Sequence, residues 1–189
     1  MFSSMTWRLI VIEWVDAVWK TTLAKGLVTS LNAIYYKTPG TRTSQQREIY
    51  DQEWISTTER FRFYLEACRE DLIKIMEIQA GWRDVVCDRL LASTIAHHQS
   101  MDSLLDINDA EDLELTTPKT QILLQASRDI IIKRLSERWA LTRFEKDVSL
   151  FVCTQASFLK RANNLVIQTD LHNIEETLQI SLQYLSNNH

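Results

Sequence analysis

Five short, mainly apolar runs recur along the chain, and longer segments with helical spacing separate them. The runs cover residues 8–13, 33–36, 84–88, 121–126 and 165–169. They are shorter than ordinary helices and lack the alternation of a half-buried strand. Strands of this kind are buried on both faces, and when helices connect them they form a parallel sheet. The sequence therefore predicts an α/β fold of three layers, with a five-stranded parallel sheet between helices.

The segments between these runs are predicted to be helical. They cover residues 20–32, 44–79, 92–101, 129–137, 144–161 and 173–184. The second is expected to break near residues 56–59, where Thr57 or Thr58 would cap the new helix. Residues 102–117 are acidic and are expected to form an exposed loop or a short helix. A chain of 189 residues suits one domain, residues 1–189.

Composition excludes several classes of protein. The net charge of −4 gives no strong attraction to nucleic acid. No run of about 18 apolar residues is present, so we expect no membrane span. Residues 1–8 are too short and too polar for a signal peptide. Cys68, Cys87 and Cys153 show no metal-binding spacing and form no even set, which favours a reducing, cytoplasmic location.

The segment after the first strand carries the strongest chemical signal. A phosphate-binding loop between a strand and a helix reads G-x-x-x-x-G-K-[ST]. Lys20 and Thr21 fit this pattern, with Trp14 and Trp19 in the two glycine positions. In such a loop, backbone N–H groups face the phosphates, the lysine reaches the β- and γ-phosphates, and the hydroxyl binds Mg²⁺. The residues expected around the ATP phosphates are Trp14, Val15, Asp16, Ala17, Val18, Trp19, Lys20, Thr21 and Thr22.

From this segment alone, an ordinary strand, loop and helix with a chance Lys-Thr-Thr remains an alternative. Glycines in a phosphate loop permit unusual dihedral angles and close approach of the backbone to the ligand. A tryptophan immediately before the lysine would place an indole where a phosphate, or the turn itself, belongs.

A series of motifs, in order along nearly the whole chain, resembles those of the thymidylate kinase family. The family opens with a strand, a phosphate loop containing an aspartate, and K-T-T-L, which Asp16 and residues 20–23 match. A proline-glycine turn, an R-E-I run, a D-R pair, an S-x-x-A-Y-Q run and an arginine-rich lid follow in the family. Their counterparts here are residues 37–40, 47–49, 88–89, 93–99 and 134–145. The chain departs from the pattern at Lys37, Thr38, Leu90 and His97.

This resemblance implies a P-loop NTPase fold with a small helical lid, at about residues 136–146. It implies transfer of the γ-phosphoryl group of ATP to a nucleoside monophosphate, dTMP foremost, with Mg²⁺ as cofactor and a homodimer as the assembly. Lys20 would hold ATP, Arg89 would grip the acceptor phosphate, and Thr21 with Asp88 would order the metal. The residues that it implies for the acceptor are Asp16, Phe63, Tyr64, Arg69, Arg89, Ser93 and His97.

The lid segment also has a chemical argument of its own. Phosphoryl transfer depends on positioning and positive charge, and residues 15–18 contain no arginine. A cation must then come from elsewhere, so we expect Arg138 or Arg143 to act at the transferring phosphoryl group. These arginines could instead lie on a solvated helix face.

The other candidate residues also have purely structural interpretations. Asp88 and Arg89 could be a structural ion pair, and Phe63 and Tyr64 could be core residues. His97 and the adjacent His98 point apart on a helix, which favours a surface position over a metal site.

Glycine is scarce and tryptophan abundant, with 3 and 6 copies. Average usage of about 7% would give roughly 13 glycines. Trp14, Trp19, Trp82 and Trp139 all stand where glycine would be unremarkable, and Trp7 where a small residue would suit, whereas Trp54 lies in a predicted helix. One hypothesis is that UGA codons, which some bacteria read as glycine, have been translated as tryptophan. The rival hypotheses are a kinase fold that has lost ATP binding and serves as a nucleotide-binding or regulatory protein, and a kinase with an altered loop and another phosphate donor.

Overall fold

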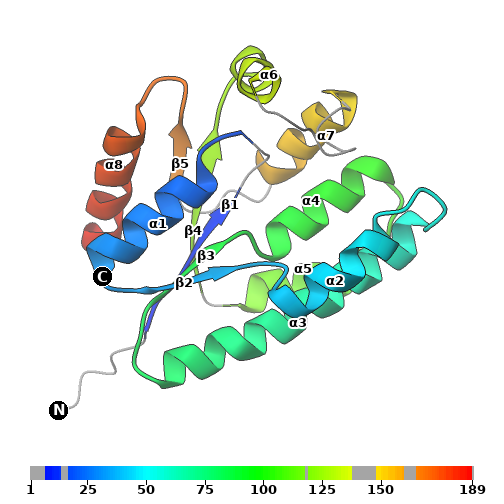
Figure 1. Ribbon diagram of the computed structural model, residues 1–189, viewed down its shortest axis with the longest axis horizontal. Coiled ribbons are helices and arrows are strands. Elements are labelled where there is room, and N and C mark those ends of the chain that lie inside the picture. Colours follow the sequence, from blue (N-terminus) through cyan, green and yellow to red (C-terminus); the bar gives the residue numbers. More distant parts are fainter. Residues whose placement is uncertain (1–6, 14–16, 118, 138–147, 160–164, 189) are drawn as a thin grey trace.

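The fold is a three-layer α/β sandwich around one parallel sheet (Figure 1). The computed structural model describes residues 7–13, 17–117, 119–137, 148–159 and 165–188. All strands run parallel, in the order β2-β3-β1-β4-β5. The strands are β1 (Leu9–Glu13), β2 (Ile34–Lys37), β3 (Val85–Asp88), β4 (Thr120–Gln125) and β5 (Leu165–Gln168). The predicted five-stranded parallel sheet is confirmed.

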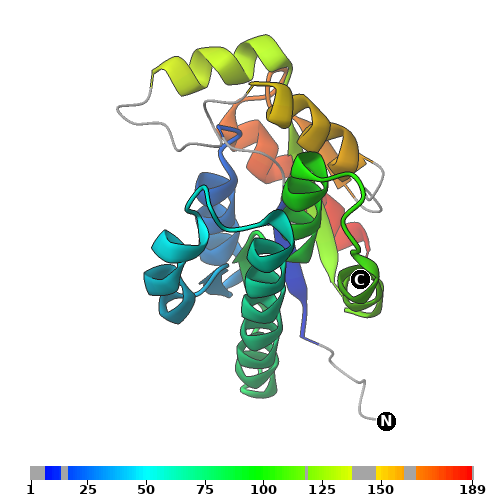
Figure 2. The ribbon, with the colours of Figure 1, turned by 90° about the vertical axis from the view of Figure 1, so that its right-hand side faces the viewer.

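Helices cover both faces of this sheet (Figures 1 and 2). They are α1 (Lys20–Leu31), α2 (Thr41–Tyr50), α3 (Thr57–Ala80), α4 (Leu91–Met101), α5 (Asn108–Thr116), α6 (Arg128–Ser136), α7 (Val148–Leu159) and α8 (Ile174–Asn187). The acidic segment 102–117 thus contains a short helix, one of its two predicted forms. None of the described helices combines the length and apolar character that a membrane span requires.

The central strand divides the core in two. Ile10 and Ile12 of β1 pack in a cluster with apolar residues of α1 and α8. Leu9 and Val11 point to the other face, into a cluster with residues of α3, α4 and α5. All five residues of β1 are buried, which is why its first four residues are all apolar instead of alternating with polar ones.

The parallel register gathers the carboxyl ends of three strands. Asp88 of β3 lies beside Ile12 of β1 on one side and beside Lys37 of β2 on the other. Ligands of such sheets bind outside the carboxyl ends of the strands. The segments that follow β1, β2 and β3 therefore meet at the edge where a ligand is expected.

The N-cap of helix α3 lies one residue before its predicted caps. Ser56 has an extended backbone, and its hydroxyl accepts a hydrogen bond from the Glu59 backbone N–H at 3.2 Å, while the Glu59 carboxylate accepts from the Ser56 N–H. The predicted caps Thr57 and Thr58 are wrong because Thr57 is already helical, so Ser56 forms the capping box. Trp54 lies in the turn between α2 and α3, which corrects its predicted helical placement.

Two tryptophans adopt a backbone conformation that normally belongs to glycine. Trp19 has φ 62° and Trp82 has φ 67°, whereas none of the glycines has a positive φ. The left-handed region costs an L-residue roughly 1–2 kcal/mol because Cβ approaches a carbonyl oxygen. Both positions are tight turns into a regular element, Trp19 before α1 and Trp82 between α3 and β3. The backbone thus treats these two positions as glycine sites.

Trp82→Gly is expected to leave the protein as stable as the parent or more stable. The relief of left-handed strain, about 1–2 kcal/mol, offsets the edge-to-face contact of Trp82 with Trp7, worth about 0.5–1.5 kcal/mol. Trp54→Gly is the matched control, since Trp54 is 76% exposed and Trp82 70% exposed, but Trp54 has no positive φ. Urea denaturation measures both, and a larger loss for Trp82→Gly than for Trp54→Gly would contradict the argument.

Candidate active site

A pocket opens at the carboxyl edge of the sheet, beside the start of α1. Its volume is about 340 Å³. Residues 17–22 of the predicted phosphate loop line one side, and Lys37, Asp88 and Arg89 line another. Arg134 and Glu137, at the end of α6, complete the described lining. The three chain segments that the sequence singled out after β1, β2 and β3 therefore share one pocket.

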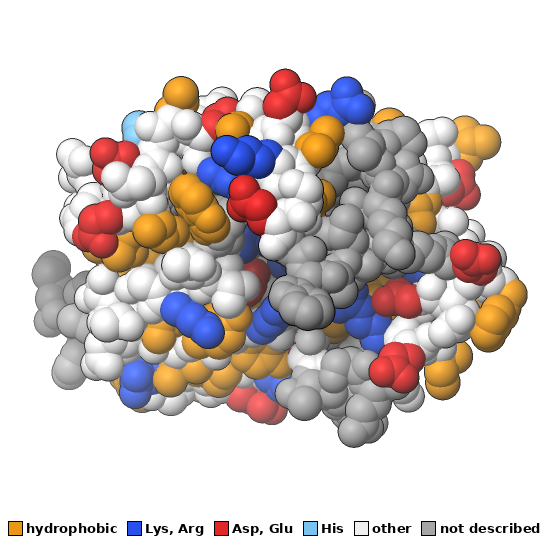
Figure 3. All heavy atoms as spheres, turned by 45° about the horizontal axis from the view of Figure 1, so that its top comes forward, with side chains coloured by type: hydrophobic (Ala, Val, Ile, Leu, Met, Phe, Trp, Pro, Cys, Tyr) orange, Lys and Arg blue, Asp and Glu red, His pale blue; other side chains and the backbone are white. Residues whose placement is uncertain are grey.

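Basic side chains dominate this pocket. Lys20, Lys37, Arg89 and Arg134 line it, against two acidic residues. Lys20 is only 6% exposed although it is the first residue of α1. Figure 3 shows Lys and Arg side chains interleaved with Asp and Glu around the grey segments on this side of the molecule. A concentration of cations at a helix start suits a polyanionic ligand such as a nucleotide phosphate.

Two oxygen-bearing side chains form a candidate magnesium site. The Thr21 hydroxyl donates to Asp88 Oδ2 at 2.5 Å, and the Tyr35 hydroxyl donates to the same oxygen at 3.2 Å. Burial, and then the charge of Asp88, raise the pKa of Tyr35 to about 12, so this hydroxyl stays a donor. Among the described residues no group of three or more His, Cys, Asp or Glu is arranged to hold a metal. One or two hard oxygen ligands, with phosphates and water completing the shell, are how Mg²⁺ commonly binds, so the residues fit the metal.

Arg134 ties the phosphate loop to the neighbouring elements. Its guanidinium lies 4.1 Å from the centroid of the Trp19 ring. It donates to the Ala17 carbonyl oxygen at 3.2 Å and to Thr169 Oγ1 and O at 2.9 and 2.7 Å. The loop backbone, α6 and the end of β5 are thus joined through one side chain.

Arg134 is the residue of the arginine-rich run that the structure brings to the pocket. The predicted lid arginines, Arg138 and Arg143, lie outside the described residues, as do Trp14, Val15 and Asp16 of the loop. The sequence placed Arg134 in the same run but assigned it no role. Its signal was its position in the arginine-rich run, four residues before Arg138 in the sequence.

Arg89 is linked through Ser93 to Glu13, a residue that the sequence analysis did not select. Its backbone is left-handed, with φ 74°, and its Nη1 donates to Ser93 Oγ at 3.3 Å. The Ser93 hydroxyl in turn donates to the carboxylate of Glu13, the last residue of β1. Burial raises the pKa of Glu13 to about 7. The available signal was a lone glutamate closing an otherwise apolar strand.

The turn after β2 is locked onto the Asp88-Arg89 segment. The Thr38 hydroxyl donates to the Arg89 carbonyl at 3.0 Å. Asp71 of α3 accepts from the Gly40 N–H at 2.9 Å and from the Tyr36 hydroxyl at 2.7 Å. A Cβ on Gly40 would lie 2.7 Å from an Asp71 oxygen, so this position requires glycine.

The remaining predicted acceptor residues lie outside the described pocket lining. Phe63 stacks on Tyr50 with ring centroids 4.0 Å apart. The Tyr64 hydroxyl donates to Asp51 at 2.9 Å. Arg69 pairs with Glu66 at 3.2 Å. His97, on α4, is half-buried.

The predicted surface position of His98 is wrong. The side chain is 1% exposed, and its Nδ1 lies 2.7 Å from the Thr94 carbonyl oxygen. Burial lowers its pKa to about 4, so the ring is neutral. The expectation that the two histidines point apart is wrong as well, since their rings lie edge to face with centroids 5.5 Å apart, and His98 also faces the Phe61 ring in the core.

Comparisons with known proteins agree with this geometry. No protein-family model matches the chain. A probable thymidylate kinase of Archaeoglobus fulgidus is 27% identical over 173 residues, covering 86% of each chain. Two solved thymidylate kinases share the fold. That of Candida albicans has a TM-score of 0.77 at 16% identity, over 98% of this chain and 94% of that one. That of Ehrlichia chaffeensis has a TM-score of 0.70 at 17% identity, over 96% of this chain and 98% of that one.

Arg134→Ala is expected to destabilise the protein by about 2 kcal/mol, because it removes charge-assisted hydrogen bonds to two segments. Lys133→Ala, an exposed change on the same helix, is the control, with an expected effect below about 0.5 kcal/mol. Urea denaturation of both variants provides the measurement. Equal losses for the two would show that Arg134 does not hold the loop.

Proposed function

We propose that this chain, which resembles thymidylate kinases in sequence and shares their fold, is a nucleoside monophosphate kinase that transfers the γ-phosphoryl group of ATP to dTMP, giving dTDP. The observation that carries the proposal is the convergence of Lys20, Arg89 and the Thr21–Asp88 pair on one pocket. A lysine at a helix start, an arginine on a neighbouring strand end and an oxygen pair for Mg²⁺ are the parts that phosphoryl transfer requires. The whole chain would act as a single kinase domain.

Lys20 would contact the β- and γ-phosphates of ATP, with the N–H groups at the start of α1 facing the same oxygens. Thr21 and Asp88 would hold Mg²⁺, which neutralises charge on the phosphates when bound. Residues 17–22 line the pocket and would provide the backbone around the phosphates.

On the acceptor side, Arg89 would bind the dTMP phosphate, since a guanidinium matches a phosphate in two-point geometry. Asp16 would contact the acceptor sugar, and Arg138 or Arg143 would close over the transferring group. Lys37 lines the same pocket beside Asp88 and Arg89, so it adds a second cation on this side. The acceptor base would lie beyond Arg89, toward Phe63, Tyr64, Arg69 and His97.

The family resemblance also suggests a homodimer, which we include in the proposal. The three cysteines form no disulfide, which fits the reducing cytoplasm that we propose as its location.

A second candidate function follows from Trp19. Its left-handed backbone and its indole, stacked with Arg134, stand at the loop position that directly precedes Lys20. If the polypeptide carries tryptophan here, close approach of a phosphate is obstructed, and the chain would serve as a nucleotide-binding or regulatory protein. If the position is glycine, the obstruction is absent.

The decisive experiment compares the chain as written with the Trp14→Gly/Trp19→Gly double variant. Calorimetry measures Mg·ATP binding, and a coupled assay measures phosphorylation of dTMP and of the other nucleoside monophosphates. We expect the double variant to bind Mg·ATP at micromolar strength and to prefer dTMP. The chain as written should bind Mg·ATP more weakly and should transfer phosphate about 100-fold more slowly, the cost of misplacing reacting groups by about 1 Å.

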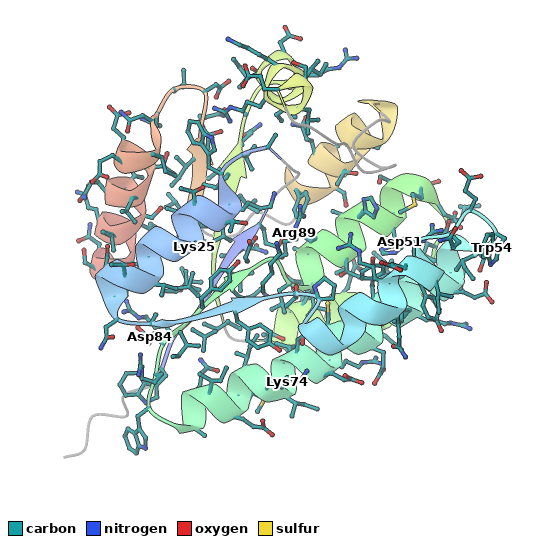
Figure 4. The ribbon with its side chains drawn as sticks, viewed as in Figure 1. Lys25, Asp51, Trp54, Lys74, Asp84 and Arg89 are labelled. Carbon is teal, nitrogen blue, oxygen red and sulfur yellow. The ribbon has the colours of Figure 1, made fainter. Side chains whose placement is uncertain are left out.

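In the double-variant background, Lys20→Ala is expected to abolish transfer, whereas Lys25→Ala is the matched control. Lys25 is an exposed lysine on α1, away from Arg89 (Figure 4). If the double variant neither binds ATP nor transfers phosphate, the kinase proposal is wrong. If the chain as written binds Mg·ATP at micromolar strength, the steric argument is wrong and the regulatory alternative falls.

Peptide mass spectrometry of the protein from its native source decides the codon hypothesis separately. Glycine at residues 14 and 19 would support it, and tryptophan there would end it.

A further inference from the structure

We propose that Glu13 is a positioning residue that orients Arg89 through Ser93 and thereby governs binding of the acceptor phosphate. This inference rests on the proposed function, because it takes Arg89 as the phosphate ligand. Glu13 itself lies behind Arg89, is 0% exposed and does not line the described pocket.

The contacts of the Glu13 carboxylate are divided between its two oxygens. Oε1 accepts from the Leu90 N–H at 2.8 Å and from the Ser93 N–H at 3.4 Å. Oε2 accepts from the Ser93 hydroxyl. One side chain of β1 therefore grips the start of α4 at three donors, immediately after Arg89.

The Ser93 hydroxyl links the Glu13 carboxylate to Arg89. A hydroxyl has one proton to donate and lone pairs that accept. Its proton points to Glu13, so its lone pairs are turned toward Arg89 Nη1, 3.3 Å away. A charged acceptor strengthens such a hydrogen bond and polarises the next one in the chain. The carboxylate thus sets the direction of the relay from Arg89 through Ser93 to Glu13.

Strand β1 also holds the backbone of Arg89. With φ 74°, Arg89 sits in a conformation that persists only where its surroundings impose it. Its N–H donates to the Ile12 carbonyl at 3.0 Å, and the next N–H, of Leu90, donates to Glu13. Consecutive N–H groups are held by consecutive residues of β1, which fixes the backbone of Arg89, while Ser93 contacts its side chain.

A purely structural role would not require a carboxylate here. Burial raises the pKa of Glu13 from 4.5 to about 7. In the folded protein the group therefore binds its proton more tightly than in the unfolded chain, so ionisation reduces stability as the pH rises from about 4.5 to about 7. A buried carboxyl group with a raised pKa, in hydrogen-bond contact with a residue that holds a pocket cation, is a candidate functional group.

The other titratable groups around Glu13 modulate this charge. Glu114 of α5 raises its pKa, and Arg89 lowers it. Glu114 is paired with Lys119 at 3.1 Å. Burial raises the pKa values of Cys68 and Cys87, so both thiols are neutral near pH 7.

Three variants and a control test the proposal by dTMP binding, which can be measured without ATP. Glu13→Gln keeps the shape but removes the charge, and Ser93→Ala cuts the relay while leaving Glu13 in place. Ser93→Thr keeps the hydroxyl. Asp84→Asn is the matched control, since it also neutralises a carboxylate in a hydrogen-bonded network, with Arg8, but at the opposite end of β3 from Arg89 (Figure 4).

Calorimetry at pH 8 is expected to show dTMP binding weakened by about tenfold in Glu13→Gln and in Ser93→Ala, the size of one lost charge-assisted hydrogen bond. Asp84→Asn should bind like the parent, and Ser93→Thr, which restores the hydroxyl, should bind more tightly than Ser93→Ala. The parent's advantage over Glu13→Gln should shrink as the pH falls below about 7, where Glu13 gains its proton. The phosphate's own pKa of about 6 affects both proteins equally and cancels in this ratio.

Parent-like affinity in both Glu13→Gln and Ser93→Ala would overturn the inference while leaving the proposed function intact. If the parent itself does not bind dTMP, the proposed acceptor is wrong, and the side-chain ¹⁵N signal of Arg89 decides the inference without a ligand. A rigid Arg89 in the parent that becomes mobile in Glu13→Gln and Ser93→Ala supports the relay, and unchanged mobility rejects it. Should Glu13→Gln not fold, Ser93→Ala and Ser93→Thr decide it.

Discussion

The placement of β1 at the centre of the sheet organises everything else in the molecule. Its parallel pairing with β3 sets Ile12 beside Asp88, and β3 in turn sets Asp88 beside Lys37 of β2. Because successive residues of β1 face opposite layers, the same strand contributes to both halves of the core. A one-residue slip of this register would exchange those faces and would separate Glu13 from the start of α4. The strand register thus brings the segments that form the pocket to one edge of the sheet, whatever conformation the loops adopt.

Two arginines of the pocket are held in place by residues that lie outside or at the edge of it. Arg134 is held by carbonyl groups of Ala17 and Thr169, and Arg89 by Ser93 and the backbone of β1. An arginine has many rotamers, and ordering it on binding costs roughly 0.5–1.5 kcal/mol. Contacts that order it in advance remove that cost, so the residues behind the pocket belong to the site as much as those that face it.

The sequence predicted the sheet, the loop and the Asp88-Arg89 position because apolar periodicity and motif spacing are local properties. It did not predict Glu13 or Arg134, because their roles depend on which side chains the register and the α6 end bring together across the fold. His98 was misplaced because a pair of adjacent polar residues on a helix does not reveal which of them faces the core. Ser56 was missed as a cap because three hydroxyl residues in a row, 56–58, leave the first helical residue ambiguous.

The backbone also bears on the scarcity of glycine. Of the four tryptophans within the described residues, Trp19 and Trp82 have left-handed φ, whereas Trp7 and Trp54 do not. The glycines show the reverse, with none at positive φ. Glycine is the residue expected in left-handed turns, because it has no Cβ. The hypothesis that UGA codons for glycine have been written as tryptophan accounts for this inversion at Trp19 and Trp82 together, since one lies in the pocket and the other at the far end of β3. Loss of ATP binding would account only for Trp19, because Trp82 has no part in the pocket.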